Sequence, residues 1–108
     1  MSNGNKRSRT ERREREREAV KLAKARLKLA GLELGGAADR PIDVESASTI
    51  EVHAQSTPCA SCAEHGVRVE EHTAETIGER RLRVVRVKCP RCGVQRNVYY
   101  RIGTPLLS

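Results

Sequence analysis

The sequence has very few large aromatic side chains. Phe and Trp are absent, and two tyrosines are present among 108 residues. Because such rings normally supply much of the buried area of a small core, a compact domain built from this chain needs another source of stability. Metal ions and disulfides are the usual additions in domains of this size, and the chain has four cysteines.

The sequence also lacks any apolar run that approaches the length of a membrane span. Its N-terminal segment, MSNGNKRSRTERRERERE, is charged and has no apolar stretch of the kind found in secretory signals. These absences predict a cytoplasmic or nucleoid-associated protein. In such a reducing compartment, paired cysteines are metal ligands more often than disulfides.

Charge is distributed unevenly along the chain, whose formal net charge is +7. Residues 1–34 carry eleven basic and five acidic side chains, residues 35–57 carry one and four, and residues 58–108 carry nine and five. A basic arm, an acidic joint and a basic end indicate a polyanionic partner, such as nucleic acid, a ribonucleoprotein or RNA polymerase.

The first third of the chain predicts a disordered basic segment at 1–8 and a long helix over 9–34. Ser8 and Glu11 form a capping-box pattern, and a Gly-Gly pair follows Leu34. Two apolar rows lie on opposite sides of this helix at 100° per residue. One row is expected to cover the protein's own core. The second, with Leu22, Leu29 and Leu32, predicts a seam for self-association or a partner, unless the rest of the chain wraps both rows.

The remaining segments predict an acidic linker at 35–57 followed by β-structure. Within the linker, alternation over Thr49–Ala54 predicts one short strand. Two further segments, RRLRVVRVK and VQRNVYYRI, are typical of strands, and a weaker strand, VRVEEHTAET, precedes a turn at Gly78. A bulge at Val84–Val85 would bring four apolar residues to the core face: Leu82, Val84, Val85 and Val87.

The cysteines form two C-x2-C pairs, Cys59–Cys62 and Cys89–Cys92. Each spacing suits a tight turn that directs both sulfurs to one point, and two such turns supply four thiolates for one tetrahedral Zn²⁺. His65 follows the first pair and is expected to be a loop residue, not a ligand. His53 and His72 are expected on strand surfaces.

Three other uses of the cysteines compete with a zinc site. A redox pair requires a helix N-terminus after the motif, whereas Gly93 and an alternating strand follow here. A rubredoxin-like iron site uses the same four thiolates, but rubredoxins are acidic and rich in aromatic residues. A pair of disulfides requires export, for which no signal is visible.

The second cysteine pair, in the sequence CPRCG at 89–93, resembles the second knuckle of the zinc ribbon superfamily. The first, PCASCAEHG, lacks a glycine directly after Cys62. The resemblance covers residues 57–102. It implies a zinc ribbon of about three antiparallel strands at 58–103. Together with the long basic helix and the linker, the chain is expected to form a small α+β fold with a tail at 104–108.

A closed four-cysteine site leaves no open coordination position, and the sequence shows no catalytic triad, phosphate loop or carboxylate pair. We therefore expect no enzyme, but a transcription or translation accessory protein that binds nucleic acid or a nucleoprotein complex. DNA, RNA, ribosome and polymerase remain open. The alternative is a protein–protein interaction module that uses the two-sided helix. The basic helix is expected to add phosphate contacts to a predicted nucleic-acid surface on the strands, which consists of Arg81, Arg83, Arg86, Lys88, Tyr99 and Arg101.

Overall fold

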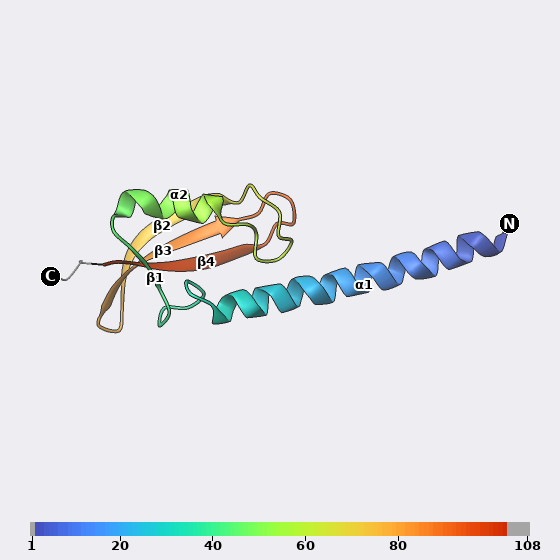
Figure 1. The fold of residues 1–108 in the computed structure, drawn as a ribbon, viewed down its shortest axis with the longest axis horizontal. Helices are drawn as coiled ribbons and strands as arrows, with labels where there is room; N and C mark the ends of the chain where they lie inside the picture. The colour runs from blue at the N-terminus through green and yellow to red at the C-terminus, as the bar shows by residue number, and fades with distance from the viewer. Residues whose placement is uncertain (1, 104–108) are drawn as a thin grey trace.

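The protein consists of a small sheet-and-helix body from which one long helix projects (Figure 1). This computed structural model describes the backbone of residues 2–103 and the side chains of residues 9–103. The predicted α+β class is confirmed. The predicted tail at 104–108 lies outside the described residues. The elements in chain order are α1 (Ser2–Leu32), β1 (Ile42–Val44), η1 (Ala47–Thr49), α2 (Ile50–Ser56), β2 (Arg68–Ile77), β3 (Arg80–Lys88) and β4 (Gln95–Ile102).

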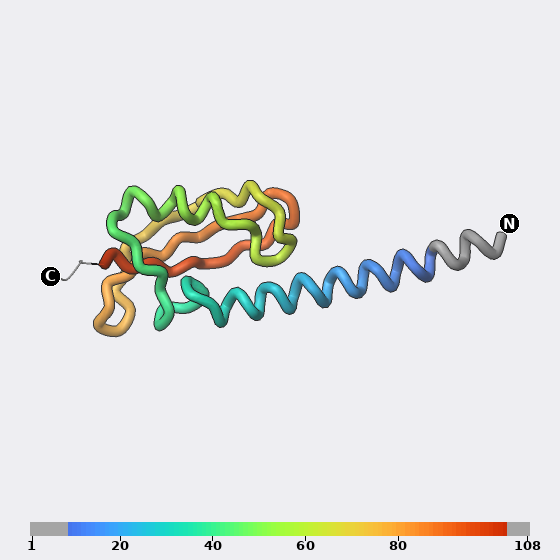
Figure 2. Tube along the Cα trace, viewed as in Figure 1, coloured from blue at the N-terminus to red at the C-terminus, as the bar shows by residue number. Residues whose placement is uncertain are grey.

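Helix α1 is longer at its start than the sequence predicted. It begins at Ser2, so Ser8 lies inside the helix and is not its N-cap. Because extending a helix is far easier than nucleating one, a proline-free segment continues the charged helix that follows it. The helix ends at Leu32, where Arg40 Nη2 donates a hydrogen bond to the carbonyl oxygen of Gly31 at 2.7 Å. Figure 2 shows α1 passing the body and extending well beyond it, and the structure measures 72 × 21 × 21 Å.

The sheet has four strands in the order β1-β4-β3-β2. The three predicted antiparallel strands are β2, β3 and β4. The fourth strand, β1, was not predicted; it pairs in parallel with β4, with Ile42 opposite Tyr100. The segment predicted as a linker therefore contributes an edge strand, and β4 has a hydrogen-bonded strand on each side.

The predicted strand at Thr49–Ala54 is wrong, because residues from Ile50 onward form helix α2. Strand geometry would place Ile50, Val52 and Ala54 on one face, but Val52 is exposed. Ile50 and Ala54, one helical turn apart, are buried. Spacing by four satisfies this burial pattern, and spacing by two does not. Figure 1 shows α2 lying over one face of the sheet.

The predicted bulge at Val84–Val85 is also wrong. Strand β3 pairs with β4 without a shift from Arg83 to Lys88, and the irregularity lies in β2 between Val69 and Glu71. Val84 and Val85 therefore point to opposite faces. Both are nevertheless buried, because Val84 lies between its cross-strand neighbours Thr73 and Tyr99, whereas Val85 faces α2.

The main core lies between α2 and the sheet. Its buried members are Ile50, Ala54, Val85, Val87 and Tyr100. Tyr100 is the only aromatic ring in this core, and its hydroxyl lies 2.8 Å from Nδ1 of His53 on α2. A second, smaller cluster surrounds the cysteines at the end of the sheet near which α1 leaves the body.

Candidate metal centre

The four cysteines meet at one point between the loop before β2 and the loop joining β3 to β4. Their Sγ atoms all lie within 4.8 Å of one another. Cys59 Sγ lies 3.6 Å from Cys92 Sγ, and Cys62 Sγ lies 3.7 Å from Cys89 Sγ. A tetrahedron with Zn–S bonds of about 2.3 Å has S···S edges of about 3.8 Å. The sulfur positions therefore fit one four-coordinate metal ion, for which zinc is the most plausible identity.

The two cysteine loops have the same backbone hydrogen bonds. In the first, Ala63 N donates to Cys59 O at 2.9 Å, and Cys59 N donates to Glu64 O at 2.9 Å. In the second, Gly93 N donates to Cys89 O at 2.8 Å, and Cys89 N donates to the carbonyl oxygen five residues on at 3.0 Å. The missing glycine after Cys62 therefore does not change the turn.

The two loops also have the same backbone conformation at the residue that follows the second cysteine of each loop. Gly93 has φ +77° and Ala63 has φ +64°, and Ala63 is the only non-glycine residue with positive φ in the described chain. Left-handed backbone costs an L-residue roughly 1–2 kcal/mol, so the first loop adopts the same geometry as the second at a conformational cost that the second avoids.

The loop backbone also acts on the thiols. The N–H groups of Cys92 and Arg91 favour the Cys89 thiolate and lower its pKa to about 7, against an opposing effect of desolvation. The N–H of Glu64 acts in the same direction on Cys62, but burial and the neighbouring cysteines together raise the pKa of Cys62 to about 12. Four thiolates this close repel one another, so full ionisation of the cluster requires a cation at its centre.

The cysteine cluster is buried on the side that packs against the body and exposed to solvent on the other side. Cys59 and Cys89 are buried and pack with Val67 and Val94, whereas Cys92 is exposed. A site with four protein ligands is structural in type, because no position remains for a substrate. His65 lies on the exposed surface and is not among the clustered residues, as expected.

The predicted surface position is confirmed for His53, which is exposed, and is wrong for His72. His72 lies on β2 with a side chain only 12 % exposed, and its Nδ1 is 3.0 Å from Glu51 of α2. His53 lies on α2, not on a strand, and contacts Tyr100. Both side chains therefore link α2 to the sheet.

The residues of the predicted nucleic-acid surface divide between the two faces of the sheet. By strand alternation and register, Arg86, Lys88, Tyr99 and Arg101 share the face opposite α2. Arg81 and Arg83 point to the other face, where Arg83 Nη1 lies 3.4 Å from His72 Nε2. The six side chains thus do not form one surface.

Two of these arginines are paired with carboxylates. Arg86 lies 3.6 Å from Glu70 and 3.0 Å from Glu71. Arg101 Nε donates to Asp43 on the unpredicted strand β1 at 2.7 Å, and this contact lowers the pKa of Asp43. The positive potential of this sheet face is correspondingly reduced.

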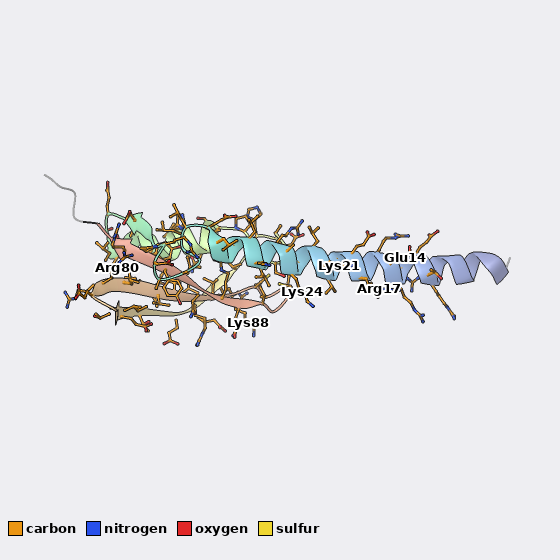
Figure 3. The ribbon with its side chains drawn as sticks, turned by 90° about the horizontal axis from the view of Figure 1, so that it is seen from below. Glu14, Arg17, Lys21, Lys24, Arg80 and Lys88 are labelled. Carbon is orange, nitrogen blue, oxygen red and sulfur yellow. The ribbon has the colours of Figure 1, made fainter. Side chains whose placement is uncertain are left out.

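Helix α1 carries a basic row that the sequence analysis did not single out, although its spacing was visible. The intervals are four, four, three and four residues, which place five side chains within an arc of about 80°. No carboxylate of residues 9–103 forms an ion pair with any of them, and all five are exposed. Figure 3 shows Arg17, Lys21 and Lys24 following one another along the helix. We call this set the basic row: Arg13, Arg17, Lys21, Lys24 and Lys28.

The predicted seam lies on a different side of α1 and is exposed. Leu22, Leu29 and Leu32 are 52 %, 58 % and 65 % exposed. The other apolar row is half-buried at Ala23, Leu27 and Ala30. The rest of the described chain therefore does not wrap both rows.

Comparisons with models of protein families, with curated proteins and with solved structures found no match. The zinc ribbon resemblance thus rests on the cysteine spacing and the loop geometry. Within the described residues, no helix combines the length and apolar character needed to cross a membrane.

Proposed function

We propose that this chain is a non-catalytic, zinc-stabilised protein that binds nucleic acid through the basic row of α1. The observation that supports the proposal is the set of five exposed cations without carboxylate partners on one side of a projecting helix. From Arg13 to Lys28 the row spans about 22 Å, which matches the axial rise of about six nucleotide steps.

The sheet contributes less to this surface than the sequence suggested. Arg86 and Arg101 are paired with carboxylates, and Tyr99 packs beside Val84. Lys88 lies at the end of β3, opposite Arg68 on β2. These two side chains add positive charge at the end of the sheet beside the metal centre. In this proposal the metal centre holds the body together, and the helix makes most of the phosphate contacts.

Salt dependence tests the proposal. Five phosphate contacts on duplex DNA give a slope of log K against log salt of about −4.5, which is about a 500-fold loss of affinity between 50 and 200 mM salt. The double variant Lys21→Gln, Lys24→Gln should make the slope shallower by about 1.8. The matched control, Arg12→Gln with Arg15→Gln, removes the same charge from other sides of the helix and should leave the slope close to its original value.

Two results contradict the proposal. One is the absence of binding to duplex or single-stranded nucleic acid at low salt. The other is an equal change of slope in both double variants, which would mean that total charge, not the basic row, determines binding. Circular dichroism of each variant checks that the helix is intact.

A second candidate function is self-association through α1, and the exposed leucine seam favours it. Leu22, Ala25, Leu29 and Leu32 follow the i, i+3, i+7, i+10 spacing of a helix–helix seam. The leucine seam spans only about 15 Å, which is shorter than the several heptads of a stable coiled coil. This function is therefore ranked second.

Analytical ultracentrifugation tests self-association directly. A dimer that becomes a monomer with Leu29→Asp and Leu32→Asp, but not with the equally exposed Val52→Asp on α2, supports the seam. A monomeric wild-type protein at high micromolar concentration refutes it.

A further inference from the structure

An apolar cavity lies between α2, the sheet and the last turn of α1. Its volume is about 120 Å³. Much of its wall is aliphatic, with contributions from Ile42, Val67, Val87, Val94 and Val98, and it also borders Cys59 and Cys89. A cavity of about 150 Å³ with a similar lining is large enough to bind benzene in another protein, so this one admits a single ring or a short aliphatic chain.

One wall of the cavity is polar. Arg96 lies on the face of β4 that points to the core, where it interrupts the apolar series between Val94 and Val98. Tyr100 and His53 line the cavity too and are joined by their 2.8 Å hydrogen bond. Arg96 also lies close enough to Tyr100 for its charge to favour the phenolate, against the larger effect of burial.

The Arg96 guanidinium forms no hydrogen bond or ion pair in the part of the chain that the structure describes. An anion that brings its own apolar group would gain a charge-assisted hydrogen bond to this half-buried cation and would also bury its apolar part against the aliphatic wall. Glu33, at the end of α1, also lines the cavity but forms no ion pair with Arg96.

We propose that this cavity binds a small monocarboxylate with an apolar tail of about five carbons. The carboxylate lies at Arg96, and the tail lies among Val87, Val94 and Val98. The site is separate from the basic row and does not depend on nucleic-acid binding. Because Ala30, Glu33 and Leu34 line the cavity, an occupant would contact the end of the arm as well as the body.

The test uses hexanoate, with 1-hexanol and acetate as probes of the tail and of the carboxylate alone. Binding to the zinc-loaded protein is followed by the methyl resonances of Val87 and Val98. Hexanoate is expected to saturate, and Arg96→Gln to weaken it by about 10- to 100-fold, the range for a lost charged hydrogen bond. The same variant should leave the weaker binding of 1-hexanol unchanged. Glu33→Gln removes a negative charge that would repel the hexanoate carboxylate, so this variant should bind hexanoate more tightly.

Several results would overturn the proposal. These are the absence of methyl shifts up to about 10 mM hexanoate, equal affinity for hexanoate and 1-hexanol, or unchanged hexanoate binding by Arg96→Gln. Ala54→Leu places a larger side chain against the cavity and should abolish binding of both six-carbon probes. If Ala54→Leu keeps its fold and zinc and still binds hexanoate normally, the ligand lies elsewhere.

Discussion

Exchanging alanine and glycine at the two equivalent loop positions should change stability in opposite directions. Ala63→Gly is expected to stabilise the zinc-loaded protein, and Gly93→Ala to destabilise it. Both residues follow the second cysteine of their loop and have positive φ, +64° and +77°. No atom would obstruct an added Cβ at Gly93, so the backbone angle alone decides the cost there.

The magnitude follows from two opposing contributions. Left-handed backbone costs an L-residue roughly 1–2 kcal/mol. Glycine in turn loses more conformational entropy on folding, which opposes the gain from Ala63→Gly by about 0.4–1 kcal/mol. The net expectation is a gain of up to about 1.5 kcal/mol for Ala63→Gly and a loss of similar size for Gly93→Ala.

Urea unfolding in a buffer of fixed free zinc measures both changes. The matched control is Gly78→Ala in the β2–β3 turn, because Gly78 also has φ +64° and open space for a Cβ. Its loss should equal that of Gly93→Ala, since the same backbone conformation is involved far from the cysteines. A decrease in stability for Ala63→Gly, with Gly78→Ala behaving as expected, would refute the equivalence of the two loops.

Two further predictions concern the metal and the core. Native mass spectrometry should find one zinc per chain and none in Cys89→Ser, and chelation should abolish the cooperative unfolding of the body, because zinc binding of about 10–16 kcal/mol is comparable to the whole stability of a small domain. Retention of tertiary structure after complete zinc removal would contradict this. Burial raises the pKa of Tyr100 from 10 to about 12, so the unfolded chain ionises first and stability should fall by about 2–3 kcal/mol between pH 10 and 12. Tyr100→Phe should remove this alkaline loss, and an unchanged pH profile in that variant would exclude Tyr100 as its cause.

The parts of this structure that local patterns determine were predictable from the sequence. Each C-x2-C pair specifies a turn within a few residues, so the cluster could be anticipated without knowing how the loops meet. The strands β2, β3 and β4 are long enough for alternation to be recognised. The exposure of the second leucine row also followed from counting, because one helix cannot bury two opposite sides against a small body.

The parts that depend on tertiary context were not predictable. Strand β1 has three residues and exists because β4 offers it an unpaired edge. Helix α2 has seven residues, and its pattern fits a strand as well as a helix until the burial of Ile50 and Ala54 is known. The bulge at Val84–Val85 was wrong because it assumed that all apolar residues of β3 face one core. The sheet instead buries valines on both of its faces.

The position of the acidic residues explains why the proposed nucleic-acid surface lies on the helix and not on the sheet. Asp43 on β1 lies in register with Arg101, and Glu71 on β2 lies in register with Arg86, so folding brings carboxylates from distant segments onto the basic sheet face. On α1 no glutamate forms an ion pair with the basic row, although Glu14 lies three residues before Arg17, and folding brings no other described segment alongside the projecting part of the helix. The net charge of each segment makes both regions look basic, and it therefore overstates the positive potential of the sheet. In the proposed function, the cations of the helix therefore contact nucleic acid, and the zinc-stabilised body holds the C-terminal end of that helix.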